Sequence, residues 1–385
     1  MRVFVIDDSL FYRRVVAELA ASIDGVSVAG TAEGCDEALR KLERDEADVV
    51  LCDVFMPGKD GLATLTEIRR RYPDMLVAMM SGVSTRGAES TVRALQMGAF
   101  EFVRKPDSKD GNANVKRLSQ DLKSVLRLAG IHLNTANAVR AISGVAVKNS
   151  RAVSQPPNRT SDISTVERYV ALGIGVSTGG PEALSTLLPA LPADFPVPVL
   201  LVQHMPPSFT KALAESLNRK CALHITEAQD DEPVEPGHVY MAPGGMHMRL
   251  RRTGARQRVQ LSDTPPVHNC RPSVDVLFQS MAEVYDGNLL AVVLTGMGDD
   301  GCEGVREMKR RGCCCLTQSP ESCVVYGMPR MVVEAGLSDC SLPIEEIAGA
   351  LKSLTTTGRF TPKTAPSGQA IVEDEREAQE KYKER

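Results

Sequence analysis

Along the first 128 residues, short apolar runs alternate with longer segments whose apolar positions recur every three or four residues. The runs predict strands at residues 2–6, 26–30, 48–52, 75–80 and 100–104, in which apolar residues predominate. The intervening segments predict helices that begin near Leu10, Asp36, Leu62, Ser90 and Val115. Strands that are apolar throughout are buried on both faces, and their alternation with helices is typical of a parallel sheet. We therefore expect a doubly wound α/β domain over residues 1–128.

The same alternation returns after residue 168. Apolar runs at 169–172, 197–202, 289–294 and 313–316 predict buried strands, and helices are expected at 181–188, 209–218, 273–285 and 344–354. A less regular middle section has strand-like stretches around 223–226, 238–241, 246–250 and 258–261. This pattern predicts a second doubly wound parallel sheet over residues 168–355.

Two segments break the pattern. Residues 129–167 are rich in Ser, Asn, Pro and Arg and carry no sustained apolar period, so we expect a mobile linker with at most short helical pieces. Residues 356–385 end in a densely charged stretch, Glu373–Arg385, which predicts a solvated, disordered tail.

Composition narrows the class of protein. A chain of 385 residues with 43% hydrophobic residues can build two cores, and a net charge of -4 argues against a nucleic-acid binder that works through general basicity. No apolar run reaches transmembrane length, and the N-terminus enters a strand rather than a signal peptide. The ten cysteines show no paired C-x-x-C spacing, so we expect reduced thiols and a cytoplasmic protein.

In the first domain, polar residues fall where predicted strands end. They are Asp7, Asp8, Asp53, Ser81 and Lys105. Open α/β sheets bind ligands at this edge, and gathered carboxylates need a hard cation such as Mg²⁺. A carboxylate beside Mg²⁺, a hydroxyl and an ammonium can accept a phosphoryl group. Taken singly, the acids could be ordinary helix-starting residues and the lysine a solvated surface residue.

This set resembles the receiver domain of bacterial response regulators. The matching positions are Asp7-Asp8, Asp53 with Met56-Pro57 and Asp60-Gly61, Ser81, and Lys105-Pro106. The resemblance implies a flavodoxin-like fold with Asp53 as phosphoacceptor, Mg²⁺ on Asp7, Asp8 and Asp53, and phosphoryl oxygens on Ser81 and Lys105. It also implies a partner histidine kinase and a cis bond before Pro106. Phe102 would be either an aromatic switch residue or a core phenylalanine.

The second domain opens on a strand, a glycine-rich turn with Ser177, and a helix with Pro181 in its first turn. Gly175 to Gly179 fits the G-x-S-x-G pattern of a nucleophile, with helix N-terminal amides nearby for developing negative charge. The same kind of turn also binds phosphates and dinucleotides, so this stretch alone leaves both interpretations open.

The next strand ends favour acyl transfer. His204 follows one buried strand and Asp299 and Asp300 follow another, whereas a dinucleotide site would need an acid in place of His204. A histidine can take the serine proton, and an aspartate fixes the histidine's tautomer. Four further histidines are less regular candidates for the base: His224, His238, His247 and His268.

Six segments of this half resemble the catalytic domain of chemotaxis protein-glutamate methylesterases, the CheB family. They are Gly175-Val-Ser-Thr-Gly-Gly-Pro-Glu-Ala183, Gln203-His-Met-Pro-Pro-Ser-Phe-Thr210, Tyr240-Met-Ala-Pro-Gly244, Arg271-Pro-Ser-Val-Asp-Val-Leu-Phe278, Leu294-Thr-Gly-Met-Gly-Asp-Asp-Gly301 and Ser322-Cys-Val-Val-Tyr-Gly-Met-Pro329. The resemblance implies a Rossmann-like domain with Ser177 as nucleophile, His204 as base and Asp300 as orienting acid. Amides near Thr178 or in the 295–297 loop are expected to form the oxyanion hole.

The resemblance also implies a reaction. The enzyme would hydrolyse glutamate methyl esters on the cytoplasmic helices of chemoreceptors, without a cofactor for this step, and would deamidate particular receptor glutamines. The unphosphorylated receiver is expected to cover the Ser177 edge until Asp53 is phosphorylated. The alternative is a response regulator whose second domain only binds receptors or kinase. Neither interpretation involves nucleic acid or membrane insertion.

Overall fold

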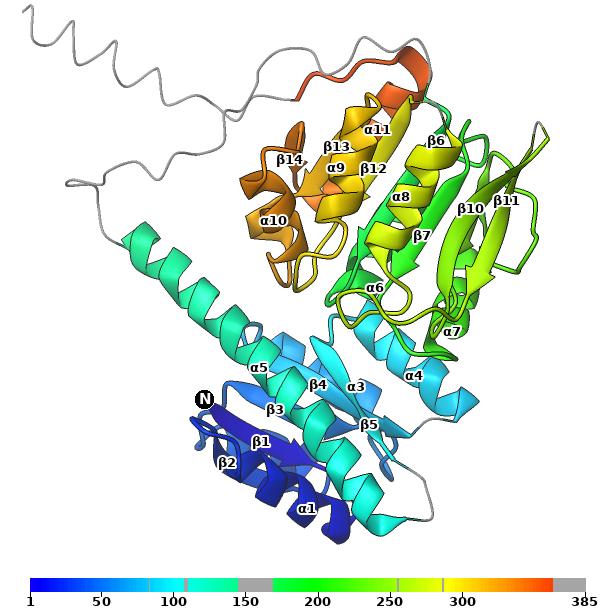
Figure 1. Cartoon of the computed structure of the whole chain (residues 1–385). Coiled ribbons are helices and arrows are strands. Elements are labelled where there is room, and N and C mark those ends of the chain that lie inside the picture. Colours follow the sequence, from blue (N-terminus) through cyan, green and yellow to red (C-terminus); the bar gives the residue numbers. More distant parts are fainter. Residues whose placement is uncertain (83, 107–109, 145–168, 255, 286, 363–385) are drawn as a thin grey trace, which may run out of the picture.

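The computed structural model describes residues 1–362 apart from 83, 107–109, 145–168, 255 and 286. Two α/β units follow one another along the chain, the first blue to teal and the second green to orange in Figure 1. Most of the expected linker and the expected tail from residue 363 lie outside the described residues. No described helix is both long enough and apolar enough to cross a membrane.

The first unit is built on a five-stranded parallel sheet in the order β2-β1-β3-β4-β5. Its strands are β1 (Arg2–Ile6), β2 (Ser27–Ala32), β3 (Val49–Asp53), β4 (Leu76–Gly82) and β5 (Glu101–Lys105). Every residue of β3 is buried, as its unbroken apolar run predicts. The doubly wound prediction for this half of the chain is confirmed.

Helices cover both faces of this sheet. They are α1 (Leu10–Ala21), α2 (Cys35–Leu42), α3 (Gly61–Arg71), α4 (Thr85–Gln96) and α5 (Gly111–Gly144). Three of them begin at capping side chains that accept a backbone N–H: Ser9 at α1, Asp60 at α3 and Ser84 at α4. These caps fix where each helix starts after the polar end of a strand.

Helix α5 is longer than the sequence predicts. Its expected end is at residue 128, whereas it continues to Gly144, so residues 129–144 of the expected linker are helical. The helix continues because it packs on both units. Leu126 and Ala129 are buried, and the His132 ring contacts Phe100 and the Val324 carbonyl of the second unit.

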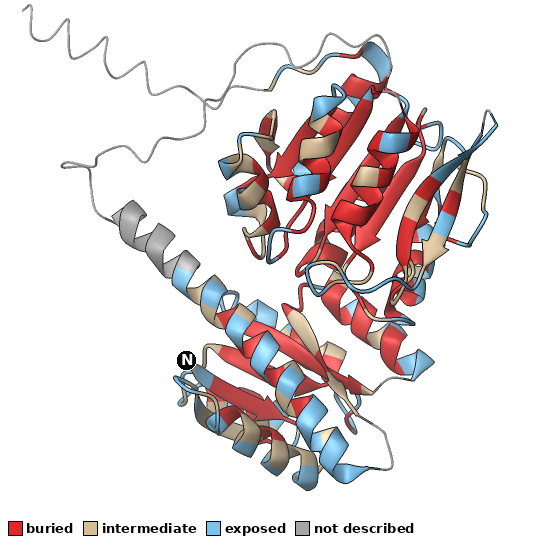
Figure 2. Cartoon of the chain, in the orientation of Figure 1, coloured by how far each residue is buried: buried red, intermediate tan, exposed pale blue. Residues whose placement is uncertain are grey.

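The second unit has a seven-stranded parallel sheet in the order β14-β13-β12-β6-β7-β9-β8 and a separate antiparallel β10–β11 hairpin. The strands are β6 (Ala171–Val176), β7 (Val199–Gln203), β8 (His224–Glu227), β9 (His238–Met241), β10 (His247–Thr253), β11 (Arg256–Ser262), β12 (Leu289–Val293), β13 (Cys314–Gln318) and β14 (Cys340–Leu342). The buried residues of Figure 2 fill the central strands.

Two layers of helices enclose this sheet. They are α6 (Gly180–Leu187), α7 (Phe209–Asn218), α8 (Val274–Val284), α9 (Cys302–Arg310), α10 (Met328–Glu334) and α11 (Ile344–Thr357). The sequence did not predict α10 or β14, because elements of seven and three residues are too short to establish a period. The cysteine run 313–315 is buried on and beside β13, as expected.

The two units meet through α4 and β5 of the first and α6 and α7 of the second (Figure 1). Phe102 of β5 stacks on Phe209 of α7, with ring centroids 4.6 Å apart. Gln96 accepts hydrogen bonds from Ser216 and Lys220 across the same boundary. In this structure Phe102 is an interdomain contact, and its role as an aromatic switch residue stays a prediction.

Candidate active site

Ser177 lies where β6 gives way to α6. Its amide donates to the Thr295 carbonyl at 3.0 Å, and its own carbonyl accepts from Gln203 Nε2 at 2.9 Å. Gly179 adopts a φ of 79°, and a Cβ on Gly180 would lie 1.9 Å from the Gln203 side chain. Only glycines allow so tight a turn here, so the backbone that carries the hydroxyl is firmly held.

His204 and Asp300 meet across the carboxyl ends of β7 and β12. The His204 ring Nε2 lies 2.8 Å from Asp300 Oδ2, and the two side chains are 11% and 3% exposed. Asp299 follows the same strand and was the other candidate from the sequence. Its carboxylate lies 3.1 Å from His268 Nδ1 and is 54% exposed. The fold therefore pairs His204 with Asp300.

Asp300 is held by the N-terminus of α8. The Ser273 hydroxyl donates to Oδ1 at 2.8 Å, and the amides of Val274 and Asp275 donate at 2.8 and 2.9 Å. Although burial raises the pKa of Asp300, the His204 and amide hydrogen bonds lower it below its ordinary value. The site therefore keeps Asp300 ionised and fixed in one orientation.

A reciprocal contact ties α8 to α9. Asp275, in the first turn of α8, accepts from the amides of Gly301 and Gly304 at the start of α9. Burial raises the pKa of Asp275 to about 6. The N-terminus of a helix carries partial positive charge. The N-terminus of α8 thus binds the Asp300 carboxylate, which precedes α9, and the N-terminus of α9 binds the Asp275 carboxylate of α8.

The second ring nitrogen of His204 faces a thiol. Cys270 Sγ lies 3.7 Å from His204 Nδ1, and no hydrogen bond joins that ring to the Ser177 hydroxyl, a pair of residues that the structure describes in full. Burial lowers the pKa of His204, but the contacts with Asp300 and Cys270 prevail and raise it to about 9. A base with so high a pKa is largely protonated at neutral pH.

Backbone donors lie on both sides of Ser177. The amides of Ser177 and Gly296 are already bonded, to Thr295 and Val325. Within the described chain, the amides of Thr178 and Met297 have no hydrogen-bond partner. These are the two places where the sequence predicts an oxyanion hole.

The first unit covers this edge. A cavity of only about 10 Å³ remains at Ser177 and His204, and Leu95, Glu101 and Phe102 of the first unit form part of its wall. The Thr178 hydroxyl donates to Glu101 Oε2 at 2.9 Å. A peptide-bound substrate therefore cannot reach Ser177 in this arrangement.

A second polar cluster lies at the carboxyl edge of the first sheet. Oxygens of Asp7, Asp8 and Asp53 lie within 4.8 Å of one another. Lys105 Nζ lies 2.7 Å from Asp7 and 2.8 Å from Asp53. Burial raises the pKa of Asp53, although Lys105 acts against it. Three hard carboxylates against one ammonium suit a divalent cation such as Mg²⁺.

Two further expectations concern this edge. The buried Ser81 hydroxyl donates to the carbonyls of Gly82 and Gly87, and its binding to phosphoryl oxygens stays a prediction. The expected cis bond before Pro106 is not found; the cis peptide in the described chain is Arg271–Pro272.

Of the four alternative histidines, one lies at the site. His268 Nε2 is 3.2 Å from Asp275. His224 and His238 contact each other on β8 and β9, and His247 bonds to the Pro265 carbonyl. Sequence reasoning gave no role to Cys270, Ser273, Asp275 or Glu101. The first three lie in or beside the Arg271–Phe278 segment. The resemblance of this segment to the CheB family could have pointed to them.

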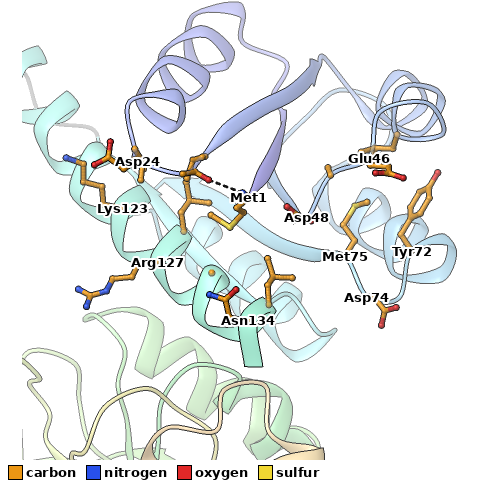
Figure 3. A pocket seen from close by; sticks show the side chains of 18 of the residues that line it. Met1, Asp24, Glu46, Asp48, Tyr72, Asp74, Met75, Lys123, Arg127 and Asn134 are labelled. Carbon is orange, nitrogen blue, oxygen red and sulfur yellow. Dashed lines mark hydrogen bonds between the residues drawn. The ribbon is translucent and has the colours of Figure 1, made fainter. Parts of the chain in front are cut away.

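A much larger hollow lies away from this chemistry. Its volume is about 1240 Å³, and it opens beside Met1, Asp48 and Met75, where strands begin rather than end (Figure 3). Lys123 of α5 lies beside Asp24 at one side of it, whereas the Arg127 guanidinium points away from the labelled carboxylates. Because it holds none of the residues singled out above, cavity size does not locate the active site here.

Comparisons with known proteins agree with this division. Residues 172–351 match the model of the CheB methylesterase family, and residues 3–115 match the response regulator receiver domain. A protein of Desulfotalea psychrophila named protein-glutamate methylesterase/protein-glutamine glutaminase is 38% identical over 352 residues, which is 90% of this chain and 96% of that protein. A protein of the same name from Symbiobacterium thermophilum is 40% identical over 360 residues, 91% and 96% of the two chains.

Solved structures are also similar. The crystal structure of the Thermotoga maritima CheB methylesterase catalytic domain is 42% identical in sequence, with a TM-score of 0.48, and covers 48% of this chain and 98% of that domain.

Proposed function

The chain belongs to the CheB methylesterase family, with a receiver domain in front of its methylesterase domain, and on this premise we propose that it hydrolyses glutamate methyl esters on chemoreceptors. The substrates would be side chains on the receptors' cytoplasmic helices, which places the enzyme in the cytoplasm. The observation that carries the proposal is the His204–Asp300 pair beside Ser177, at the carboxyl edge of one sheet.

The reaction follows from the roles of these three residues. Ser177 Oγ attacks the ester carbonyl while His204 Nδ1 takes its proton, since Asp300 occupies the other ring nitrogen. His204 then gives the proton to the leaving methoxide, and methanol departs. Water, deprotonated by His204 in turn, hydrolyses the acyl-enzyme to glutamate. An amide substrate would follow the same route and release ammonia, so deamidation of receptor glutamines is a second activity of the same site.

Negative charge develops on the carbonyl oxygen during both steps. The amides of Thr178 and Met297 are our candidates to stabilise it, because they flank Ser177 and are unbonded in the described chain. The neighbouring amides of Ser177 and Gly296 are committed to the backbone and are excluded from this role.

The receiver supplies control. Asp53 would accept a phosphoryl group from a histidine kinase of the chemotaxis type. Asp7, Asp8 and Asp53 would hold Mg²⁺, which offsets the charge of the incoming group, and Lys105 and Ser81 would bind its oxygens. Ser81 must first leave its contact with Gly87.

Control would act through access to Ser177. The receiver face that carries Glu101 and Phe102 closes the site, so phosphorylation would shift the population toward an undocked form. Ser81 lies on β4 next to α4, and α4 also packs on the second unit, so movement of Ser81 toward a phosphoryl group offers a route between the two sites.

The test is methanol release from a methylated receptor cytoplasmic fragment. We compare untreated protein, protein with Mg²⁺ and a small phosphodonor, and Ser177→Ala under both conditions. The proposal expects release that rises with phosphodonor and vanishes in the variant. No release from a fragment that another methylesterase does cleave would leave a receptor-binding module as the better interpretation.

A further inference from the structure

Cys270 differs from the other nine cysteines in its neighbour. Its thiol is half-buried and lies 3.7 Å from His204 Nδ1, and among the described residues no other cysteine forms a hydrogen bond with an imidazole. Cys221 and Cys323, the other two half-buried thiols, have pKa values raised by burial. Cys270 is thus set apart by position, on the catalytic side of the His204 ring.

The position of Cys270 is fixed by a tight turn. Val267 and Cys270 exchange two backbone hydrogen bonds, and the residues between them, His268 and Asn269, have φ values of 49° and 60°. Such left-handed conformations are unfavourable for side-chain-bearing residues and persist only where contacts enforce them. Here His268 is held by Asp275 and Asp299, at 3.2 and 3.1 Å. The turn therefore aims the thiol at His204.

The spacing suits a metal ion. Zinc binds thiolate sulfur at about 2.3 Å and imidazole nitrogen at about 2.0–2.1 Å, so two such ligands of a tetrahedral ion lie roughly 3.6 Å apart. The distance of 3.7 Å between Cys270 Sγ and His204 Nδ1 is close to this ligand-to-ligand distance. Asp300 lies on the other ring nitrogen of His204, so Cys270 Sγ and His204 Nδ1 are the two ligand atoms that could share one ion here.

The outer contacts suit the ion as well. Histidines that bind zinc usually donate their other ring N–H to a carboxylate, which orients the ring and raises its basicity. Asp300 occupies that place on His204 Nε2 and is itself held by three donors from Ser273, Val274 and Asp275. The arrangement that prepares His204 as a base also prepares it as a zinc ligand.

We propose that Cys270 Sγ and His204 Nδ1 form an inhibitory site for Zn²⁺. Binding would release two protons to solvent, one from the Cys270 thiol and one from Nδ1 of the protonated His204 ring, and form one Zn–S and one Zn–N bond, with water in the remaining positions. Nδ1 could then no longer accept the Ser177 proton. The inhibition rests on the proposed esterase function, whereas the binding itself does not.

Binding is tested with Co²⁺ as a spectroscopic substitute for zinc. The full chain is stripped with chelator, dialysed, and given excess Mg²⁺ so that the carboxylates of the receiver are occupied. A thiolate-to-cobalt charge-transfer band in the near ultraviolet is expected in wild type and in Cys221→Ser, to be lost in Cys270→Ser and Cys270→Ala, and to be displaced by Zn²⁺. A band that persists in both Cys270 variants overturns the proposal.

Inhibition is tested on phosphodonor-activated protein in zinc-buffered solution. Each variant is compared with its own zinc-free rate of methanol release. Half-inhibition of Cys270→Ser and Cys270→Ala is expected to need at least tenfold more free Zn²⁺ than wild type and Cys221→Ser. Equal sensitivity of all four proteins overturns the inhibitory site. A chain without esterase activity would refute the proposed function and still leave the cobalt measurement decisive for the binding.

Discussion

Glu101, the first residue of the receiver's last strand, accepts a hydrogen bond of 2.9 Å from Thr178, the residue after Ser177. The two are 77 positions apart in the chain. Glu101 Oε1 also accepts from the amide of Phe102, whose ring stacks on Phe209. A carboxyl group of the regulatory unit thus lies directly against the turn that carries the nucleophile.

Two substitutions of Glu101 should change the basal rate of methanol release in opposite directions. Burial raises the pKa of Glu101 above its ordinary value of 4.5, so the docked form favours the protonated carboxyl. Docking of the two units should therefore weaken as the pH rises from 4.5 through the raised pKa. Glu101→Gln keeps the acceptor without the charge, and we expect it to lower methanol release before phosphorylation. Glu101→Lys should raise it severalfold. Glu89→Gln, at an exposed position on α4, is the control.

Asp300 and Asp299 should differ sharply in importance. Asp300→Asn removes the carboxylate from His204 and should reduce methanol release on the order of 10³- to 10⁴-fold, as loss of a triad aspartate does elsewhere. Asp299→Asn changes an exposed carboxylate whose one ion pair among the described residues is with His268, so we expect a change below about threefold by analogy with other exposed sites. The assay is the initial rate with phosphodonor present; similar losses in both variants would contradict the assignment.

The pH dependence of the methanol-release rate should show the effect of Cys270 on the pKa of His204. His204 must be neutral to act as a base, so activity falls as pH drops below its pKa, which the docked form holds at about 9. The Cys270 contact helps to raise that pKa, and Cys270→Ala should therefore shift the acid limb of the rate profile to lower pH. Cys221→Ala should leave the limb in place. An unchanged limb in Cys270→Ala would show that the thiol does not influence the base.

Removal of divalent cations should abolish the stimulation by phosphodonor and leave the basal rate of methanol release unchanged. With chelator present, phosphodonor should no longer stimulate methanol release, because the carboxylates of Asp7, Asp8 and Asp53 would repel an incoming phosphoryl group. The basal rate should persist, since the ester hydrolysis proposed here uses no metal. Asp53→Asn should behave like chelation at every Mg²⁺ concentration. Loss of the basal rate on chelation would point to a metal in the hydrolytic step.

Gly296 should be required for activity more than for folding. A Cβ at this position would lie 2.6 Å from Ser177 Cβ and 2.5 Å from the Met328 sulfur. We expect Gly296→Ala to displace Ser177 and to lower kcat at least tenfold while circular dichroism shows a folded chain. Gly349→Ala, in α11 with nothing within 4 Å, is the control and should add up to about 1 kcal/mol of stability through helix propensity.

Local pattern predicted most of the secondary structure. Apart from Asp53 at its end, β3 is apolar, as is all of β12, and both are buried strands. Consecutive apolar residues predict this, because a strand buried on both faces needs apolar side chains at every position. The helices predicted to begin near Leu10 and Leu62 are found there, and the structure shows Ser9 and Asp60 capping their first amides. The continuation of α5 past residue 128 did not follow from local pattern, because His132 there contacts Val324, 192 positions away.

The sequence by itself determined which residues stand at strand ends: Ser177, His204, the Asp299–Asp300 pair, and the acids of the receiver. Only the tertiary structure set Asp300 rather than Asp299 against His204, brought Cys270 to the other ring nitrogen, and placed Glu101 on Thr178. Strand ends are fixed by local hydrophobic period. Which side chains meet there depends on the order β12-β6-β7 of the sheet and on the docking of two units, and both join residues that lie far apart in the chain.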